Sequence, residues 1–283
     1  MSKDIIPAMP VFPLMTAEQI DTYYQRLGLQ DADRTPSYEN LCQLHERQLQ
    51  VIPFENLDFL NGIITDLSLE GIFNKIIRQK RGGLCSENNG MFAWLLRSLG
   101  YQVTTFTARL TNADNPFQPR RHCINCVTLD GKRYLCDVGV ARENFRRPIL
   151  LEEDIEQRSG MGTYKLVKHE FFGWLLLQRL CEDGDFEGYY GFTEEPQWPF
   201  DFDYIIGFSE THPHSEDNKG NFVALLTEDG CNNMVGNDYW TFANGVKCDQ
   251  ATLTSYDDLQ RVLEQKFNIQ FVPNEEYRQR NPL

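Results

Sequence analysis

The sequence lacks a long run of apolar residues. No segment approaches the roughly twenty residues that a membrane-spanning helix needs. Residues 1–7 contain neither an uninterrupted hydrophobic stretch nor the small-residue cleavage site of a secretory signal. We therefore expect a cytoplasmic protein with no membrane partner, whose eight cysteines are free thiols and not disulfide partners.

Positive charge is also scarce. The 283 residues include 27 Lys and Arg against 41 Asp and Glu, which gives a formal net charge of −14. Such a field repels nucleic acids and anionic membrane surfaces, so neither is expected as a partner. An anionic substrate would need local positive charge. The densest basic groups are the pair Arg120–Arg121 and the set Arg142, Arg146 and Arg147.

The chain contains no internal repeat and no low-complexity linker. Apolar residues at helical spacing dominate the first hundred residues, and β-branched and aromatic runs after residue 101 predict strands. The predicted helix starts are Thr16, Ser37, Ser68 and Ser255. The predicted turns are Asp130-Gly131, Asp229-Gly230 and Asn244-Gly245. The order is helical, then β, then mixed, which indicates an α+β fold.

Cys85 stands out among the cysteines by its position. It follows the pair Gly82-Gly83 and precedes a run at helical spacing from Met91 to Leu99. A thiol at a helix start lies near unpaired N–H groups and the positive end of the helix dipole, which favour the nucleophilic thiolate. Most free cysteines are small buried hydrophobic residues, so a catalytic role requires partners elsewhere in the chain.

Histidine is scarce, with five in the chain. A catalytic thiol needs a base, usually a histidine, and the histidine needs an orienting acceptor. We expect His45 to be packed on a helix, and His212 and His214 to lie in a solvated loop. His169, in a predicted strand, is a lesser candidate. His122 begins the strand that leads into a predicted tight turn, and it is the preferred base.

The predicted hairpin places a carboxylate beside His122. With Asp130-Gly131 as a two-residue loop, Leu129 pairs with Lys132. His122 and Asp137 then share one face as diagonal neighbours, roughly 7–8 Å apart. A loop longer or shorter by one residue would put them on opposite faces. The spacing therefore predicts a Cys-His-Asp arrangement.

The spacing of Cys123 and Cys126 also fits a zinc or redox pair. Residues three apart in a strand point to opposite faces, so these two thiols are expected to diverge. No second C-x-x-C exists to complete a zinc site. We expect no metal.

Four stretches together resemble the arylamine N-acetyltransferase family. Residues 81–88 (RGGLCSEN) look like its RGGxCxEN nucleophile signature, and residues 51–57 (VIPFENL) resemble its VPFENL segment. Residues 122–127 and 134–139 are similar to the strands that carry the triad histidine and aspartate. The resemblance implies an N-terminal helical bundle, a central β-barrel-like domain and a C-terminal α/β lid, with a cysteine-protease-like Cys-His-Asp site. The implied limits are 1–100 for the bundle with the nucleophile, 101–207 for the β-rich domain with His and Asp, and 208–283 for the lid.

The resemblance also implies a reaction. Cys85, His122 and Asp137 would form the catalytic triad. Acetyl-coenzyme A would acetylate Cys85, and an arylamine, hydrazine or arylhydroxylamine would then take the acetyl group in a ping-pong sequence. The implied partners are thus small molecules, and the sequence leaves the oligomeric state open.

The resemblance assigns further positions around the triad. Phe54 and Val140 would line the acceptor pocket, although a core phenylalanine is an equal interpretation of Phe54. Gly139 and Arg142 would contact the coenzyme. Many family members continue with Phe-Gly after the strand of the aspartate, whereas this chain has Val140 and Ala141. Arg142, Arg146 and Arg147 then either supply positive charge for the coenzyme or form a solvated basic loop.

Three alternative functions use the same residues. One is a related amide-forming acyltransferase that takes another acyl thioester. Another is a cysteine hydrolase or transglutaminase-like enzyme, in which cysteine, histidine and aspartate occur in the same order. The third is a non-catalytic binding module, which the presence of all three candidate residues disfavours.

Overall fold

The computed structural model describes residues 11–111, 118–140, 144–213, 215, 217 and 219–283. Helices precede the first long strand, as the hydrophobic spacing predicts. They are α1 (Ala17–Leu27), α2 (Tyr38–Val51), α3 (Leu57–Leu60), α4 (Leu69–Phe73), a π-helix (Asn74–Arg78) and α5 (Cys85–Ser98). The predicted caps at Thr16, Ser37 and Ser68 are confirmed, because each side-chain oxygen accepts a hydrogen bond from a first-turn N–H group.

An eight-stranded antiparallel sheet follows and curls into a nearly closed barrel. Its order is β5-β4-β3-β2-β9-β8-β7-β6. The strands are β2 (Gln102–Leu110), β3 (His122–Leu129), β4 (Lys132–Cys136), β5 (Ile149–Leu150), β6 (Gln157–Ser159), β7 (Gly162–His169), β8 (Gly173–Arg179) and β9 (Glu187–Phe192). The side-chain amide of Gln157 on one edge strand bonds to both N–H and C=O of Leu150 on the other, at 2.7 and 3.0 Å. One glutamine thus bridges the two edges.

The last part of the chain is a second sheet covered by helices. A five-stranded sheet has the order β1-β10-β11-β12-β13. The strands are β1 (Phe54–Glu55), β10 (Phe222–Leu226), β11 (Gly230–Val235), β12 (Asp238–Ala243) and β13 (Val246–Thr252). The helices of this part are a 3₁₀ turn (Pro199–Phe202), α6 (Asp203–Thr211), α7 (Tyr256–Phe267) and α8 (Glu275–Arg280). Ser255 caps α7 as predicted, and β1 comes from the helical part, so the two ends of the chain share a sheet.

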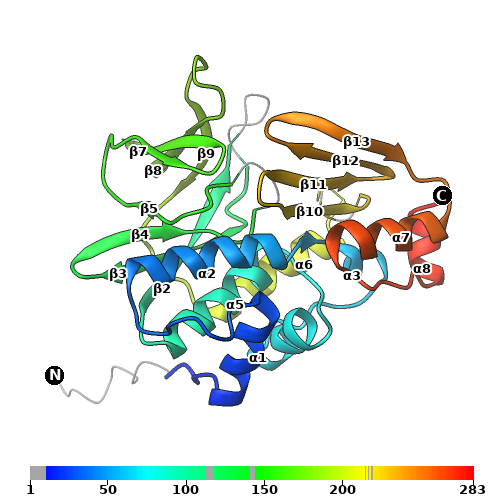
Figure 1. Ribbon diagram of the computed structural model, residues 1–283, viewed down its shortest axis with the longest axis horizontal. Helices are drawn as coiled ribbons and strands as arrows, with labels where there is room; N and C mark the ends of the chain where they lie inside the picture. Colours follow the sequence, from blue (N-terminus) through cyan, green and yellow to red (C-terminus); the bar gives the residue numbers. More distant parts are fainter. Residues whose placement is uncertain (1–10, 112–117, 141–143, 214, 216, 218) are drawn as a thin grey trace.

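Three large hydrophobic clusters form most of the core, and two small ones lie beside them. One lies under the N-terminal helices and includes Val127, Cys136 and Val138 from the barrel. A second fills the barrel, and a third lies between the five-stranded sheet and α7 and α8. Figure 1 shows α2 and α5 across the middle of the molecule, with the barrel on the left and the second sheet on the right. The mixed architecture confirms the predicted α+β class, whereas the domain limits stay a prediction.

The predicted hairpin register is confirmed. Leu129 lies opposite Lys132, and the last pair of the ladder is Asn125 with Cys136. Asp130 and Gly131 have φ values of 51° and 75°, the left-handed conformation that a two-residue hairpin turn requires. The parity argument for β3 therefore holds. It also places Cys123 and Cys126 in different clusters on opposite faces of the strand.

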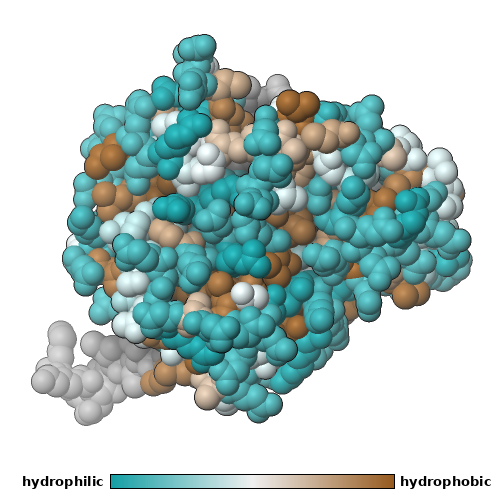
Figure 2. Space-filling model, viewed as in Figure 1, coloured by the Kyte–Doolittle hydropathy of each residue, from teal (hydrophilic) through white to brown (hydrophobic). Residues whose placement is uncertain are grey.

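The part of the chain that the structure describes contains no helix that could span a membrane. None of its helices combines the length and the apolar character that a crossing requires. The face shown in Figure 2 is covered mainly by hydrophilic side chains, with small apolar patches between them. Such scattered apolar residues are normal for a folded protein surface.

Candidate active site

The structure brings Cys85, His122 and Asp137 together from three separate elements. Cys85 is the first residue of α5, His122 the first of β3, and Asp137 follows the last residue of β4. His122 Nε2 lies 2.7 Å from Asp137 Oδ2, and both side chains are buried. Cys85 is half-buried, and its thiol lies beside His122 and 3.7 Å from the carbonyl oxygen of Arg121. The three predicted residues therefore form one connected set.

The charges within this set reinforce one another. Burial lowers the pKa of His122, but the charge and hydrogen bond of Asp137 and the contact with Cys85 outweigh it and raise this pKa to about 10. Burial raises the pKa of Asp137, yet the charge of His122 and three hydrogen bonds hold it below its usual value. At neutral pH His122 is then a cation paired with a carboxylate. Since Nε2 faces Asp137, Nδ1 is the ring nitrogen left for Cys85.

Asn89 orients the Asp137 carboxylate, and the sequence patterns did not single it out. Its Nδ2 donates to Asp137 Oδ1 at 2.9 Å and to the carbonyl of Cys123 at 2.7 Å, while its Oδ1 accepts from the N–H of Val138 at 3.0 Å. Asn89 is fully buried. The available signal was its spacing, because a residue four after Cys85 lies on the same face of α5.

Gly139 allows the chain after Asp137 to touch the start of α5. Its N–H donates to Asp137 Oδ1 at 3.0 Å. A Cβ at this position would lie 2.6 Å from the Cα of Cys85 and 2.5 Å from Nδ2 of Asn89. Side-chain atoms do not approach backbone that closely, so a glycine is required here. Gly139 also lines the cavity described next. Its contact with a coenzyme stays a prediction.

A cavity of about 490 Å³ opens onto Cys85 and His122. Its walls are mainly apolar, and they include both predicted acceptor residues, Phe54 and Val140. The further apolar lining residues are Leu84, Leu110, Tyr189, Ile205, Ile206 and Phe222. A concave apolar site beside a few polar groups is typical of small-molecule binding. Arg142, the predicted coenzyme contact, lies outside the described residues.

One ion pair lies in the wall of this cavity. Arg121 Nη1 contacts Asp217 Oδ2 at 2.7 Å, and each side chain is 19% exposed. Both residues line the cavity, and Arg121 immediately precedes His122. Asn56 holds the backbone on the Asp217 side, since its Nδ2 donates to the carbonyls of Asp217 and Gly220 at 2.6 and 2.8 Å. The cavity wall thus carries this ion pair in addition to Cys85 and His122.

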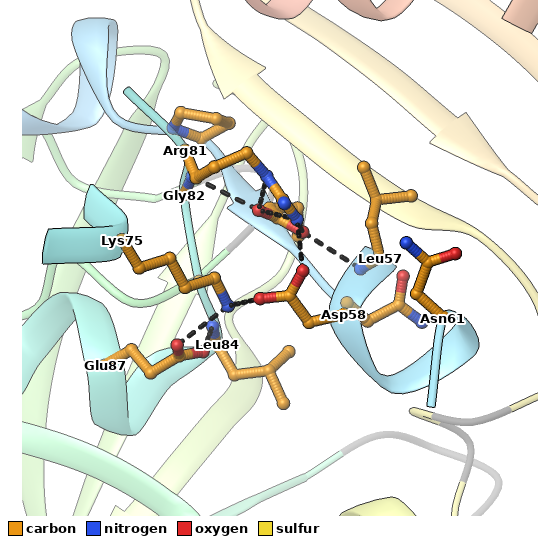
Figure 3. A network of polar contacts seen from close by, with 12 residues as sticks. Leu57, Asp58, Asn61, Lys75, Arg81, Gly82, Leu84 and Glu87 are labelled. Atoms are coloured by element: carbon orange, nitrogen blue, oxygen red, sulfur yellow. Dashed lines mark hydrogen bonds and ion pairs between the residues drawn. The ribbon is translucent and has the colours of Figure 1, made fainter. Parts of the chain in front are cut away.

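A buried charge network supports the loop that precedes Cys85 (Figure 3). Arg81 pairs with Glu55 and with Asp58, both within 2.9 Å. Lys75 pairs with Asp58 at 3.0 Å and with Glu87 at 2.8 Å. The other carboxylate oxygen of Glu87 accepts from the N–H of Leu84 at 2.9 Å, directly before Cys85. The network fixes the start of α5, and none of its charged side chains lines the cavity.

For Arg146, the interpretation of Arg142, Arg146 and Arg147 as a solvated basic loop is wrong. A solvated basic loop does not describe Arg146, which is 7% exposed. Its guanidinium donates to the carbonyl oxygens of Thr227 and Gly230 at the turn between β10 and β11. Nη1 of the same guanidinium lies 3.8 Å from the carboxylate of Glu46 on α2, so Arg146 joins the barrel to the second sheet and does not line the cavity.

The described residues contain no group of three or more His, Cys, Asp or Glu arranged to hold a metal ion. The partly exposed thiol beside an imidazole–carboxylate pair, on helices packed against a nearly closed barrel, defines a cysteine-protease-like fold with a candidate nucleophile.

Comparisons with known proteins then narrow the class. A family model described as N-acetyltransferase matches residues 37–276. The chain is 34% identical to the arylamine N-acetyltransferase of Mycolicibacterium smegmatis over 78% of this chain and 81% of that protein. It is 27% identical to arylamine N-acetyltransferase 1 of Homo sapiens over 88% of this chain and 93% of that protein. The chain belongs to the arylamine N-acetyltransferase family, a family of acyltransferases.

Solved structures agree with this assignment. The M. smegmatis arylamine N-acetyl transferase superposes with a TM-score of 0.84 at 28% identity, over 93% of this chain and 98% of that one. The Mycobacterium marinum enzyme in complex with CoA superposes with a TM-score of 0.83 at 25% identity, again over 93% and 98%. The similarity therefore covers the whole fold and not the nucleophile signature alone.

Proposed function

We propose that this enzyme transfers an acetyl group from acetyl-coenzyme A to the nitrogen of an arylamine, hydrazine or arylhydroxylamine, with Cys85 as the acyl carrier. The observation that carries the proposal is the connected set of Cys85, His122 and Asp137 at the wall of an apolar cavity. The family relationship supplies the donor and the acceptor class, and a related enzyme has been solved with CoA.

The first half-reaction acetylates the enzyme. The Cys85 thiolate attacks the thioester carbon, and the N–H groups at the start of α5 are the candidates to stabilise the oxyanion. The bond between the acetyl carbon and the coenzyme sulfur breaks. The departing thiolate takes a proton from His122 Nδ1, which leaves neutral His122, acetyl-Cys85 and free coenzyme A.

The second half-reaction releases the amide. The acceptor nitrogen attacks the acetyl carbon, and neutral His122 removes the proton from that nitrogen. Cys85 leaves as a thiolate, which restores the thiolate–imidazolium pair. Asp137 keeps Nε2 protonated throughout, and it stabilises the ring when it is charged.

The apolar walls fit an aromatic acceptor. Phe54 and Val140 contribute to the cavity beside Cys85, and the ring of an arylamine would bury its faces against them. We place this activity in the cytoplasm, because all eight cysteines are free in the structure, as they are in a reducing compartment.

Intact-mass spectrometry with acetyl-coenzyme A tests the proposal. We expect one acetyl group on the wild type, none on Cys85→Ala, and loss of that group when an aromatic amine is added. Asp137→Asn should lower kcat by about 10³-fold or more, because the imidazole loses its orienting charge. Cys181→Ala, which removes an exposed thiol on the surface, is the matched control and should behave like the wild type.

Two results would contradict the proposal. Acetylation of Cys85→Ala at the wild-type rate would exclude Cys85 as the carrier. Labelling of Cys85 by a longer acyl thioester but not by acetyl-coenzyme A would point to another amide-forming acyltransferase.

A further inference from the structure

His45 contacts the main chain of Asp137, the residue whose carboxylate holds His122. It comes from the middle of α2 and is fully buried. Its Nδ1 lies 2.9 Å from the carbonyl oxygen of Arg146, and its Nε2 lies 3.1 Å from the main-chain nitrogen of Asp137. Both partners belong to the chain that follows β4.

These two partners fix the protonation of the ring. A carbonyl oxygen only accepts and a main-chain N–H only donates, so Nδ1 must carry the proton and Nε2 must be the bare acceptor. A second proton on Nε2 would point at the N–H of Asp137. Burial agrees with this, because it lowers the pKa of His45 to about 4. His45 is therefore neutral at neutral pH, and its tautomer is set by the backbone.

Asp137 needs such an acceptor because of where it lies. The last ladder pair between β3 and β4 is Asn125 with Cys136, so Asp137 is one residue beyond the sheet. Its N–H is buried and must find a partner outside the ladder. His45 supplies it, while Asn144 donates to the carbonyl oxygen of Asp137 at 2.6 Å. The main chain of this residue is held on both sides.

The ring of His45 cannot easily turn away. It stacks on Phe145 with centroids 5.5 Å apart and an interplanar angle of 13°. Its ring also makes a T-shaped contact with Phe92 of α5, with centroids 6.0 Å apart and an interplanar angle of 75°. His45 therefore links α2, α5 and the chain after β4 at the point where Asp137 leaves the sheet.

We propose that His45 is a positioning residue, which holds the main chain of Asp137 so that its carboxylate stays on His122. This inference rests on the proposed role of the triad. The position of the Asp137 main chain sets the length of the hydrogen bond between its carboxylate and His122. Small displacements of catalytic groups lower the rate of the reaction strongly. A histidine that merely filled the core would affect stability and leave the rate of the folded enzyme unchanged.

Two substitutions separate these roles. The side-chain amide of asparagine reaches as far as Nδ1 of histidine, and that of glutamine reaches as far as Nε2. His45→Asn keeps the bond to Arg146 and loses the acceptor for Asp137, whereas His45→Gln does the reverse. Each variant loses one hydrogen bond, so the urea midpoint of unfolding should fall by a similar amount in both.

Two rates are measured on each folded variant. The first is kcat for acetyl transfer to an aromatic amine, with KM for the amine. The second is alkylation of Cys85 by iodoacetamide, which needs neither donor nor acceptor. His45→Asn should lower kcat by about ten- to a hundredfold with KM unchanged, and should slow alkylation, whereas His45→Gln should stay close to the wild type in both.

The outcomes are distinct. Wild-type kcat and alkylation in His45→Asn, or equal losses in the two variants, would overturn the positioning role. Failure of the wild type to acetylate amines would instead refute the proposed function, and the alkylation rates would still decide the role of His45.

Discussion

Arg121 and Asp217 form an ion pair in the wall of the cavity, and their opposite charges cancel. Asp217 touches the guanidinium with one oxygen at 2.7 Å, so Arg121 has further N–H donors for a second anion. The carboxylate of Asp217 repels such an anion, and the pair as a whole favours uncharged acceptors. Removal of the negative partner should shift this preference.

Asp217→Asn is therefore expected to improve acceptors that carry a carboxylate. Asparagine keeps a hydrogen-bond acceptor for Arg121 and leaves one net positive charge in the wall. KM for an aminobenzoate should fall by about tenfold, on the scale of a partly buried charge pair. The methyl ester of the same aminobenzoate is the matched control, and its KM should not change. Equal changes for the acid and the ester would show that charge is not the cause.

The residue scale also shows what the sequence could predict about the site. His122 and Asp137 lie on one short hairpin, so turn length and strand parity were enough to bring them together. Asn89 and His45 reach Asp137 from two different helices, and only tertiary packing places those helices beside the hairpin. His45 was correctly expected to be packed, but its partners are separated from it by about a hundred residues.

At the scale of elements, the well-capped and long segments were predictable. Ser and Thr caps marked the starts of four helices, and Asp-Gly and Asn-Gly turns marked hairpins. Among the helices, those that were not predicted are short or carry weak patterns: α3, α6, α8 and the 3₁₀ turn Pro199–Phe202. The run that Ser68 opens was expected as one helix through Ile77, and its second half, Asn74–Arg78, is instead a π-helix. The π-helix contains Lys75, whose side chain reaches the carboxylates of the buried network. Local propensity does not encode such a tertiary demand.

The contact between α5 and the chain after β4 gives a test at this scale. Gly139→Ala would place a Cβ against the backbone of Cys85 and the amide of Asn89, and neither is the free end of a flexible side chain. The loop and the helix start must then separate. We expect kcat/KM for acetyl transfer to fall by about a hundredfold or more while the far-UV circular dichroism is kept.

Gly90→Ala is the control within the same helix. A Cβ there would lie 3.7 Å from Cδ1 of Ile72, an ordinary contact. Alanine is favoured over glycine in a helix interior by about 0.5–1 kcal/mol, so this variant should be slightly more stable and fully active. Wild-type activity in Gly139→Ala would show that the close approach is not needed for acetyl transfer.

At the scale of the whole molecule, the buried charge network joins two of the three cores. Leu57 and Leu60 of α3 pack in the core of the second sheet, while Asp58 between them pairs with Lys75 and Arg81. Lys75 in turn pairs with Glu87 of α5, under which the N-terminal core lies. The order of helical, β and mixed regions was predictable, but this joint was not, because its charges are far apart in the sequence.

Lys75→Met should therefore destabilise the whole fold. The variant leaves the carboxylate of Glu87, which is 1% exposed, without its cation, and removes one of the two cations on Asp58. Breaking a buried ion pair in this way costs about 3–5 kcal/mol. Urea unfolding followed by fluorescence and by circular dichroism measures the free energy of unfolding. Arg261→Met is the control, because its pair with Asp258 is exposed to solvent and contributes little to stability.

The pH dependence of this loss identifies its cause. Burial already raises the pKa of Glu87 above its usual value, and removal of Lys75 raises it further. A carboxyl group with a raised pKa in the folded state destabilises the fold as pH rises above its unfolded value, and acid relieves that cost by protonation. The difference in unfolding free energy between the wild type and Lys75→Met should thus shrink from about pH 7 to about pH 5. A difference that is constant over this range would mean that lost packing of the lysine stem, and not the unpaired carboxylate, destabilises the variant.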